Sequence, residues 1–357
     1  MGIVIESPSK RAVRNQLYLG VDVGGTNVRA AAYPLRHENV EGAQAFTTSL
    51  KANDYPSLKD ALVEVMEIAE SIGVRNRITG MGFGIAGPLD GSKVKLTNHA
   101  GWKEIDLNEL AQEFGVKVGG LNDLEATSWG IVSGLKASDV EVLQKGKPDF
   151  LGDEAIIAPG TGLGEGRIIE RKYPRPSEGG HSDFAPKGEE QKALLSYLEE
   201  LYGEGKVTYE DVLSGQGLVD IAYFLAKLNG EEYDEGLGFD QGMSTEVLAT
   251  KIAKQARTGT HQLSMNAMNI YTDVLAQEAS NLAVKEKATG GIYLGGTTKH
   301  DLPFILGKRS RFLHIFQAKR KPQGFLPNVP LAVITKDDIN QLGAAYFIGH
   351  KPVKISV

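Results

Sequence analysis

The chain has no cysteine among its 357 residues. This absence excludes disulfide bonds, cysteine nucleophiles and cysteine-ligated zinc together. The chain also lacks any apolar run close to the roughly 20 residues that cross a bilayer. Its first residues have no signal-peptide pattern, because Glu6 interrupts a short apolar piece that precedes the charges. We therefore expect a cytoplasmic protein with no membrane partner.

An excess of positive charge is missing as well. The formal net charge is −6 at pH 7, whereas nucleic-acid binding normally needs a basic face. The basic residues within 308–321 have no accompanying aromatic stacking pattern, so we interpret them as a solvated surface. No Gly-x-Ser-x-Gly segment is present either, which makes Ser-His-Asp hydrolysis a poor fit. We expect no nucleic-acid partner.

The remaining composition is that of a globular protein, with 41% hydrophobic and 24% charged residues, and the length allows roughly two domains. Each half opens with a strand, a glycine turn and a second strand, and two such halves would leave a cleft for ligands. Strands are expected at 17–23, 78–85, 116–121, 155–158, 167–171 and 291–294, and helices at 57–73, 106–114, 214–230, 244–259, 263–282 and 336–348.

The first glycine turn follows an apolar strand that ends in an acid. Apolar residues alternate from Leu17 to Val23, as a strand with two distinct faces requires. Gly24 and Gly25 then allow backbone amides to approach a ligand without a side chain between them. Asp22 could hold a hydrated divalent metal near bound phosphate. A plain hairpin turn is the alternative, and this segment alone does not decide between them.

A second glycine-rich turn lies at 159–164. Its third glycine comes one residue too early for the dinucleotide-binding pattern, and no Gly-Lys-Ser/Thr follows as a Walker loop requires. Bare amides with the Thr161 hydroxyl suit a second phosphate contact between Gly160 and Gly164. A glycine hairpin without a ligand remains the alternative.

Asn122 and Asp123 stand at the C-terminal end of a predicted strand, where ligand residues gather in open α/β sheets. A carboxylate there suits a general base that accepts a hydroxyl proton during phosphoryl transfer, with the amide orienting the substrate. Either residue would also cap the helix that follows. The two interpretations are compatible, and both stay open.

Glu178, His181 and Asp183 surround two glycines in the segment 177–184. Carboxylates and an imidazole are suitable partners for the neighbouring hydroxyl groups of a sugar. A metal site is a weaker hypothesis, because a second histidine is missing. The residues around Glu210 in the sequence do not indicate a role for it.

In this order and spacing, these segments resemble the bacterial-type glucokinase family, within the actin-like ATPase and sugar kinase superfamily. The resemblance covers roughly residues 17–348, and its segments are 22–27, 85–88, 96–99 with Trp102, 122–123, 160–164, 178–186 and 212–215.

The resemblance implies a two-domain actin-like ATPase (ribonuclease H-like) α/β fold with an interdomain cleft. We expect a flexible N-terminal extension at 1–15, a small α/β domain at 16–133 plus 338–357, and a large α/β domain at 134–337. It also implies a homodimer that transfers a phosphoryl group from MgATP to the 6-hydroxyl of glucose in glycolysis. A kinase of mannose or glucosamine, or a regulator that binds sugar without phosphorylating it, are the alternatives.

The family's functional residues carry over onto positions that match its motifs. Asp123 is then the base for the sugar hydroxyl, and Asp22 lies near Mg²⁺, with water between them. The sugar-binding residues implied are Asn98, Asn122, Asp123, Glu178, His181 and Glu210, and the ATP-binding residues implied are Asp22, Gly24, Gly25, Thr26, Asn27, Gly160, Thr161, Gly162, Gly295, Gly296 and Thr297.

Overall fold

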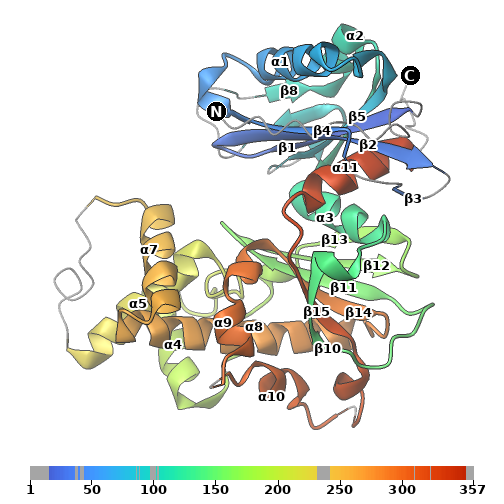
Figure 1. Ribbon diagram of the computed structural model, residues 1–357. Coiled ribbons are helices and arrows are strands. Elements are labelled where there is room, and N and C mark those ends of the chain that lie inside the picture. Colours follow the sequence, from blue (N-terminus) through green and yellow to red (C-terminus); the bar gives the residue numbers. More distant parts are fainter. Residues whose placement is uncertain are drawn as a thin grey trace. The chain divides into compact units, whose positions relative to one another are not determined.

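The computed structural model describes residues 16–36, 39–40, 44–85, 87, 89–96, 102, 104–230, 242–308, 310–321 and 323–350. The chain divides into two compact units, which Figure 1 colours by sequence. The first unit combines residues 1–138 with 336–357, and the second unit consists of residues 139–335. The predicted extension at 1–15 and the predicted sugar ligand Asn98 lie outside the described residues.

The first unit contains a six-stranded sheet. Its strands are β1 (Leu17–Val23), β2 (Asn27–Arg36), β3 (Asn39–Val40), β4 (Phe46–Lys51), β5 (Ile78–Ile85) and β9 (Lys117–Asn122). The order is β3-β2-β1-β5-β9, with β4 also on β2. Since β1, β5 and β9 run parallel, their C-terminal ends share one edge of the sheet, where ligands of α/β proteins commonly bind.

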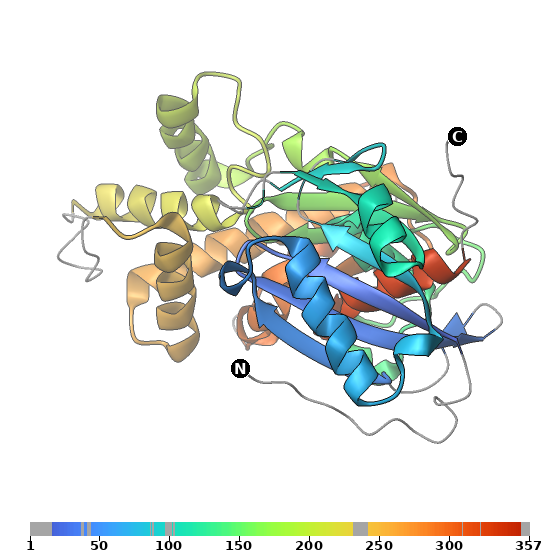
Figure 2. The ribbon, with the colours of Figure 1, turned by 90° about the horizontal axis from the view of Figure 1, so that it is seen from above.

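Helices cover both faces of this sheet. They are α1 (Leu58–Ser71), α2 (Leu107–Phe114), α3 (Asp123–Val132) and α11 (Ile339–His350). Figure 1 shows α1 and α2 on one face and α3 and α11 on the other, and in Figure 2 α1 (blue) lies over the strands. A small three-stranded sheet of β6 (Leu89–Asp90), β7 (Lys93–Lys95) and β8 (Glu104–Asp106) completes the unit.

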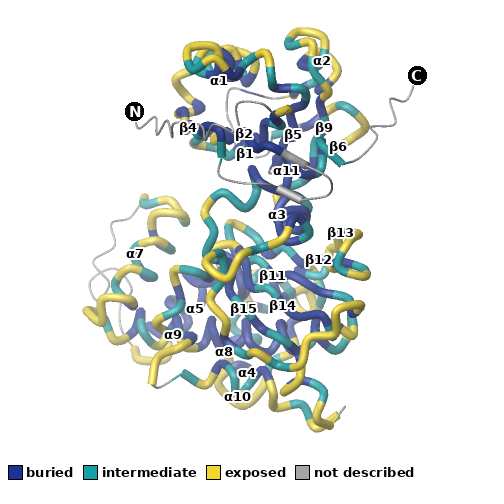
Figure 3. Tube along the Cα trace, turned by 45° about the vertical axis from the view of Figure 1, so that its right-hand side comes forward, coloured by how far each residue is buried: buried dark blue, intermediate teal, exposed yellow. Residues whose placement is uncertain are grey.

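The second unit contains another six-stranded sheet, in the order β10-β15-β14-β11-β12-β13. Its strands are β10 (Val140–Gln144), β11 (Glu154–Pro159), β12 (Leu163–Ile169), β13 (Tyr173–Ser177), β14 (Gly291–Leu294) and β15 (Leu331–Ile334). Its helices are α4 (Gly188–Tyr202), α5 (Gly215–Asn229), α7 (Thr245–Thr258), α8 (Gln262–Lys285), α9 (Leu302–Leu306) and α10 (Phe312–Gln317). The core lies between α8 and this sheet, both largely dark blue in Figure 3.

Local helix signals in the sequence are confirmed. Ser57, Asp106, Ser214 and Ser244 each accept a hydrogen bond from a backbone N–H in the first turn of α1, α2, α5 and α7. This satisfies N–H groups that have no partner within the helix. The predicted helix boundaries at these four positions are therefore correct.

The predicted strand at 167–171 is wrong at both ends. The structure has β12 at Leu163–Ile169, so Gly164 belongs to the strand and not to the turn. Glu170 and Arg171 adopt the left-handed backbone, with φ of 51° and 60°, and therefore form a turn instead of a strand. The predicted helix at 336–348 begins later, at Ile339, and ends at His350. Among the described residues, none of the helices combines the length and apolarity that a membrane span needs.

Candidate active site

The first glycine turn connects β1 and β2 as an antiparallel hairpin whose last pair is Val23 with Val28. Gly24 N–H donates to the Asn27 carbonyl at 3.0 Å. A methyl group added at Gly24 would meet no atom closer than the Asn27 carbonyl oxygen at 3.5 Å, an ordinary contact. Gly24 also lacks a positive φ. Neither backbone geometry nor packing against the described residues therefore requires glycine here, and the position has room for a ligand to approach the backbone.

Asp22 lies two residues before this turn, with its side chain 19% exposed. Its Oδ1 accepts a hydrogen bond from Asn340 Nδ2 at 3.4 Å, and its Oδ2 is 3.7 Å from the Arg29 guanidinium. Burial raises the pKa of the Asp22 carboxyl and the nearby Asp123 carboxylate raises it further, while Asn340 and Arg29 lower it. Each carboxyl oxygen thus makes one such contact with the residues that the structure describes, and both keep capacity for another ligand.

Asn122 and Asp123 form the junction between β9 and α3. Asn122 Oδ1 accepts a hydrogen bond from Glu125 N–H at 2.6 Å, so the predicted helix cap is confirmed at Asn122. Asp123 is exposed, and its Oδ1 accepts from Leu124 N–H at 2.8 Å. Although the residue is exposed, the surrounding protein removes part of the hydration of its carboxyl group, and this desolvation raises the pKa of Asp123, while backbone hydrogen bonds partly offset the rise. A raised pKa makes a carboxylate a stronger base.

The strand register brings the two acids to the same edge of one sheet. Asp22 of β1 pairs with Gly84 of β5, and the next residue, Ile85, pairs with Asn122 of β9. Asp22 therefore lies near the end of β1 and Asp123 directly follows β9, and β5 lies between these two strands. The Asp123 carboxylate raises the pKa of Asp22, which agrees with this placement. The structure thus brings two predicted site carboxylates together within the first unit.

The second glycine turn joins β11 and β12 as another antiparallel hairpin. Gly160 N–H donates to the Gly162 carbonyl at 2.8 Å, and the Gly160 carbonyl accepts from Gly215 N–H at 3.0 Å. Thr161 at the tip is exposed. A methyl group at Gly160 would meet only the Gly162 carbonyl oxygen, at 3.9 Å. Gly160 resembles Gly24 in this respect, because nothing in the described part of the chain requires it to be glycine.

Glu178, His181 and Glu210 are brought together in the second unit. His181 Nε2 lies 3.6 Å from Glu178 Oε2, and His181 Nδ1 lies 4.0 Å from Glu210 Oε1. Glu210 N–H donates to the Gly180 carbonyl at 2.9 Å, which fixes Glu210 against the loop of the other two residues. Glu178 and His181 are exposed. A polar cluster of this kind can exchange hydrogen bonds with several hydroxyl groups of one ligand.

Gly295, Gly296 and Thr297 lie beside the second hairpin. Thr297 Oγ1 donates to the Pro159 carbonyl at 3.3 Å. Gly296 has φ +60°, and a methyl group there would lie 1.9 Å from the same carbonyl oxygen. Glycine is therefore required at 296 for packing and conformation. The predicted adenosine segment and the second predicted phosphate loop are neighbours in one unit.

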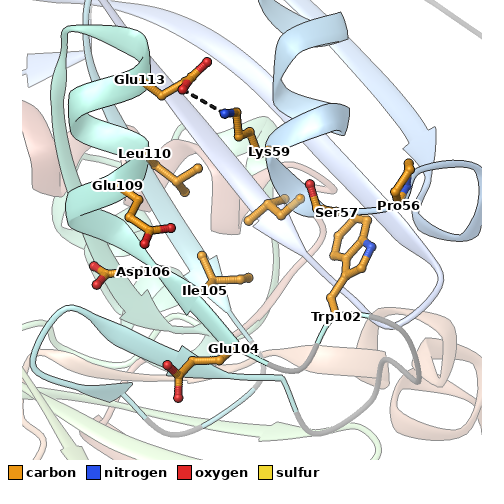
Figure 4. Close-up of a pocket in the computed structure, with 11 residues that line it drawn as sticks. Pro56, Ser57, Lys59, Trp102, Glu104, Ile105, Asp106, Glu109, Leu110 and Glu113 are labelled. Carbon is orange, nitrogen blue, oxygen red and sulfur yellow. Dashed lines mark hydrogen bonds and ion pairs between the residues drawn. The ribbon is translucent and has the colours of Figure 1, made fainter.

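A metal site within 177–184 gains no support, because no group of three or more His, Asp or Glu side chains among the described residues is arranged to hold an ion. A cavity of about 330 Å³ lies elsewhere in the first unit, between α1 and α2 (Figure 4). It is lined by Trp102 and by acidic side chains such as Glu109, while Glu113 pairs with Lys59 at 2.8 Å. None of the predicted site residues that the structure describes lines this cavity.

Two side chains that contact Asp22, Arg29 and Asn340, are not among the residues predicted from the sequence. Arg29 could have been found by counting pairs outward from the β1–β2 turn, since it pairs directly with Asp22. Asn340 comes from α11, 318 residues away in sequence, and no local pattern indicates the contact.

The chain has two α/β units, each with an antiparallel glycine hairpin on a mixed sheet, and solved structures of actin-like sugar kinases share this fold. A model of the glucokinase family matches residues 19–351, and the chain belongs to this family. It is 33% identical to a glucokinase of Nostoc sp., over 92% of this chain and 98% of that protein. It is 30% identical to a glucokinase of Synechocystis sp., over 92% and 96%.

Two solved structures extend the comparison. A glucokinase from an Antarctic psychrotroph superposes with a TM-score of 0.76 at 25% identity, covering 95% of this chain and 100% of that one. A glucokinase of Balamuthia mandrillaris in complex with glucose gives a TM-score of 0.67 at 25% identity, covering 94% of each chain. The predicted family and fold class are confirmed.

Proposed function

We propose that the chain is an ATP-dependent glucokinase, which transfers a phosphoryl group from MgATP to the 6-hydroxyl of glucose. The observation that carries the proposal is the exposed Asp123 carboxyl at a strand end, in a chain of the glucokinase family. Its raised pKa suits a base that accepts the sugar's hydroxyl proton as the phosphoryl group is transferred. The Balamuthia mandrillaris relative, crystallised with glucose, supports the choice of acceptor.

We assign sugar recognition to polar residues that come from each of the units. Asn122 precedes the base and would orient the sugar beside it, and the predicted ligand Asn98 would add to this contact. Glu178, His181 and Glu210 would accept and donate hydrogen bonds around the ring hydroxyls, since their distances of 3.6 and 4.0 Å make them one cluster. Several directed hydrogen bonds of this kind hold the reacting hydroxyl in position.

We assign nucleotide binding to the two glycine hairpins, β1–β2 and β11–β12. The N–H groups of Gly24 and Gly25, with Thr26 and Asn27, would bind phosphate oxygens. Those of Gly160 and Gly162, with the Thr161 hydroxyl, would form the second phosphate contact. Gly295, Gly296 and Thr297, next to the second hairpin, would lie against the adenosine. The room for an added methyl group at Gly24 and Gly160, whose nearest contacts would be at 3.5 and 3.9 Å, supports this assignment.

Asp22 fits a Mg²⁺ ion that arrives with the nucleotide. Mg²⁺ is commonly held by one or two carboxylates together with phosphate oxygens and water, and the Asp22 oxygens keep capacity for a ligand beyond Asn340 and Arg29 in the described part of the chain. A bound Mg²⁺ shields the negative charge of the phosphate groups. Asp22 would keep the ion in place through water, while Asp123 accepts the proton.

A matrix of phosphoryl donors and acceptors tests the function. Initial rates would be measured for MgATP, MgADP and polyphosphate against glucose, mannose and glucosamine. We expect the highest kcat/KM for MgATP with glucose. A clear preference for another hexose would change the assigned acceptor, and sugar binding with no product from any pair would identify a regulator instead.

Cellular role and assembly also follow from the family resemblance as proposals. We propose a cytoplasmic homodimer that supplies glucose 6-phosphate to glycolysis. Light scattering at micromolar concentration tests the assembly, since a mass near 38.5 kDa would indicate a monomer.

A further inference from the structure

Helices α3 and α11 of the first unit lie in direct contact (Figure 1). A methyl group at Gly343 of α11 would lie 1.7 Å from the Ala126 carbonyl oxygen of α3. One at Gly130 of α3 would lie 2.6 Å from the Ile339 carbonyl oxygen of α11. Only glycine fits at both positions, so the two helix backbones are held at a fixed short separation. Side chains that face one another across this contact are fixed as well.

The same helix α11 rests on the strands that carry Asp22. A methyl group at Gly20 of β1 would lie 1.7 Å from the Gln341 carbonyl oxygen, and one at Gly84 of β5 would lie 3.9 Å from Asn340 Cβ. Gly84 is the residue paired with Asp22. Asn340 therefore stands above the sheet beside Asp22, at the first turn of α11.

Asn340 connects α3 to Asp22 by hydrogen bonds. Thr127 Oγ1 donates to Asn340 Oδ1, and the same hydroxyl lies 3.1 Å from the Asp123 carbonyl oxygen. Asn340 Nδ2 then donates to Asp22 Oδ1 at 3.4 Å. An amide has its donor and its acceptor on opposite arms. Donation from Thr127 to the oxygen arm therefore turns the nitrogen arm toward Asp22.

We propose that Asn340 is a positioning residue for Asp22, and that Thr127 sets the orientation of the Asn340 amide. The proposal rests on the role of Asp22 in the proposed function. Besides Asn340, the described residue in contact with the Asp22 carboxylate is Arg29. The Arg29 side chain is 53% exposed and 3.7 Å away, and such an exposed ion pair orients a carboxylate weakly. The donor on the rigid α11 is thus the contact that selects one rotation of the Asp22 carboxylate.

Three variants test the proposal. Asn340→Leu removes the donor at similar volume, and Thr127→Val removes the hydroxyl at nearly unchanged shape. Ser128→Ala is the matched control, because the Ser128 hydroxyl lies on the same helix but donates to the Leu124 carbonyl at 2.9 Å. Each purified full chain would be assayed for kcat, the KM for glucose and the Mg²⁺ concentration giving half-maximal rate. Calorimetry would measure MgADP and metal-free ADP binding.

We expect Asn340→Leu to lower kcat and to raise the Mg²⁺ concentration giving half-maximal rate, each by about 10-fold. This is the usual scale for residues that orient a metal-associated side chain. The KM for glucose should change less than about twofold. The preference for MgADP over ADP should fall by a similar factor, with metal-free ADP binding unchanged. Thr127→Val should show the same pattern at smaller size, and the double variant should lose less than the sum of the two. Ser128→Ala should match the wild type.

An unchanged Mg²⁺ dependence and MgADP preference in Asn340→Leu would overturn the proposal. A uniform loss of sugar and nucleotide binding would do so too, because it indicates a purely structural role. If Asn340→Leu does not fold, Thr127→Val decides by the same criteria. A wild-type protein without sugar phosphorylation would overturn the proposed function alone, since the MgADP preference still measures what Asn340 does to Asp22.

Discussion

Glu210 Oε2 accepts a hydrogen bond from the Leu163 N–H at 2.8 Å, so a predicted sugar residue is bonded to the strand that leaves the second phosphate hairpin. The Glu210 carboxylate also lies where a side chain at Gly162 would stand. The predicted sugar cluster and the predicted phosphate loop are therefore joined at Glu210, and a change in one displaces the other.

Gly162→Ala should impair sugar binding. The added methyl group would lie 2.5 Å from Glu210 Oε2, so the carboxylate must move away from Leu163 and from its place 4.0 Å from His181. We expect the KM for glucose to rise about 10-fold or more, the scale for a misplaced binding group. Steady-state kinetics with glucose varied at saturating MgATP measures it. An unchanged glucose KM would remove Glu210 from the sugar site.

Gly160→Ala should impair nucleotide binding with little effect on folding. The methyl group has room in the chain and Gly160 has no positive φ, so we expect the melting temperature to stay within about 2 °C of the wild type. The KM for MgATP should rise roughly 10-fold, a loss of about 1.4 kcal/mol in binding. A normal KM would mean that no phosphate approaches Gly160, and that the glycine belongs to a plain hairpin.

The fold was predictable wherever the signal is local. The caps at Ser57, Asp106 and Ser214 lie within three residues of the N–H groups they accept from. The two glycine hairpins lie between runs of apolar residues that form their strands. Element boundaries that depend on distant contacts were not predictable. Glu170 and Arg171 form a turn although their neighbours are strand-like, because the partner strand β13 begins only at Tyr173.

The candidate site likewise contains residues that a local motif indicates and residues that only distant contacts bring to it. Glu178 and His181 are close in sequence, so one motif indicated them both, whereas Glu210 joins them through pairing between 182–184 and 207–209. Asn340 reaches Asp22 only because glycines on α3, α11 and two strands permit close helix packing. A contact that depends on packing between residues hundreds of positions apart leaves no periodic pattern in the sequence.

Asp123→Ala should lower kcat by about 100-fold or more, the usual contribution of a general base. The wild-type rate should fall on the acid side with an apparent pKa above the ordinary aspartate value, because the desolvated Asp123 must lose its proton to act. A pH–rate profile of both proteins measures this. An unchanged melting temperature serves as the control for folding, and a near-normal turnover would remove Asp123 from the base role.

Asp22→Asn should separate metal use from sugar binding. The amide keeps the size of the side chain but removes the charge that attracts Mg²⁺. We expect lower turnover and a higher Mg²⁺ requirement, while glucose binding measured by calorimetry stays unchanged. Loss of glucose binding in this variant would place Asp22 in the sugar site instead.

Glu165 should make the protein less stable as the pH rises. The residue is 1% exposed, and its Oε1 has no hydrogen-bond partner in the described part of the chain. Burial, and after it the neighbouring Glu278 carboxylate, raise the pKa of the Glu165 carboxyl to about 8, although Lys285 lowers it. The folded protein therefore holds a proton that the unfolded chain, with a pKa near 4.5, releases.

The contribution of this proton to the free energy of unfolding is therefore fully present below about pH 4.5, and it is lost as the pH rises through about 8. Each pKa unit of difference is worth about 1.4 kcal/mol of unfolding free energy. Glu165→Gln keeps the neutral shape at every pH, so its advantage over the wild type should grow from pH 5 to pH 9 in urea denaturation. Glu189→Gln, whose wild-type side chain is 91% exposed, should show no such trend. Parallel stability curves for Glu165→Gln and wild type would mean that Glu165 is ionised in the folded protein, and that Lys285 compensates its charge.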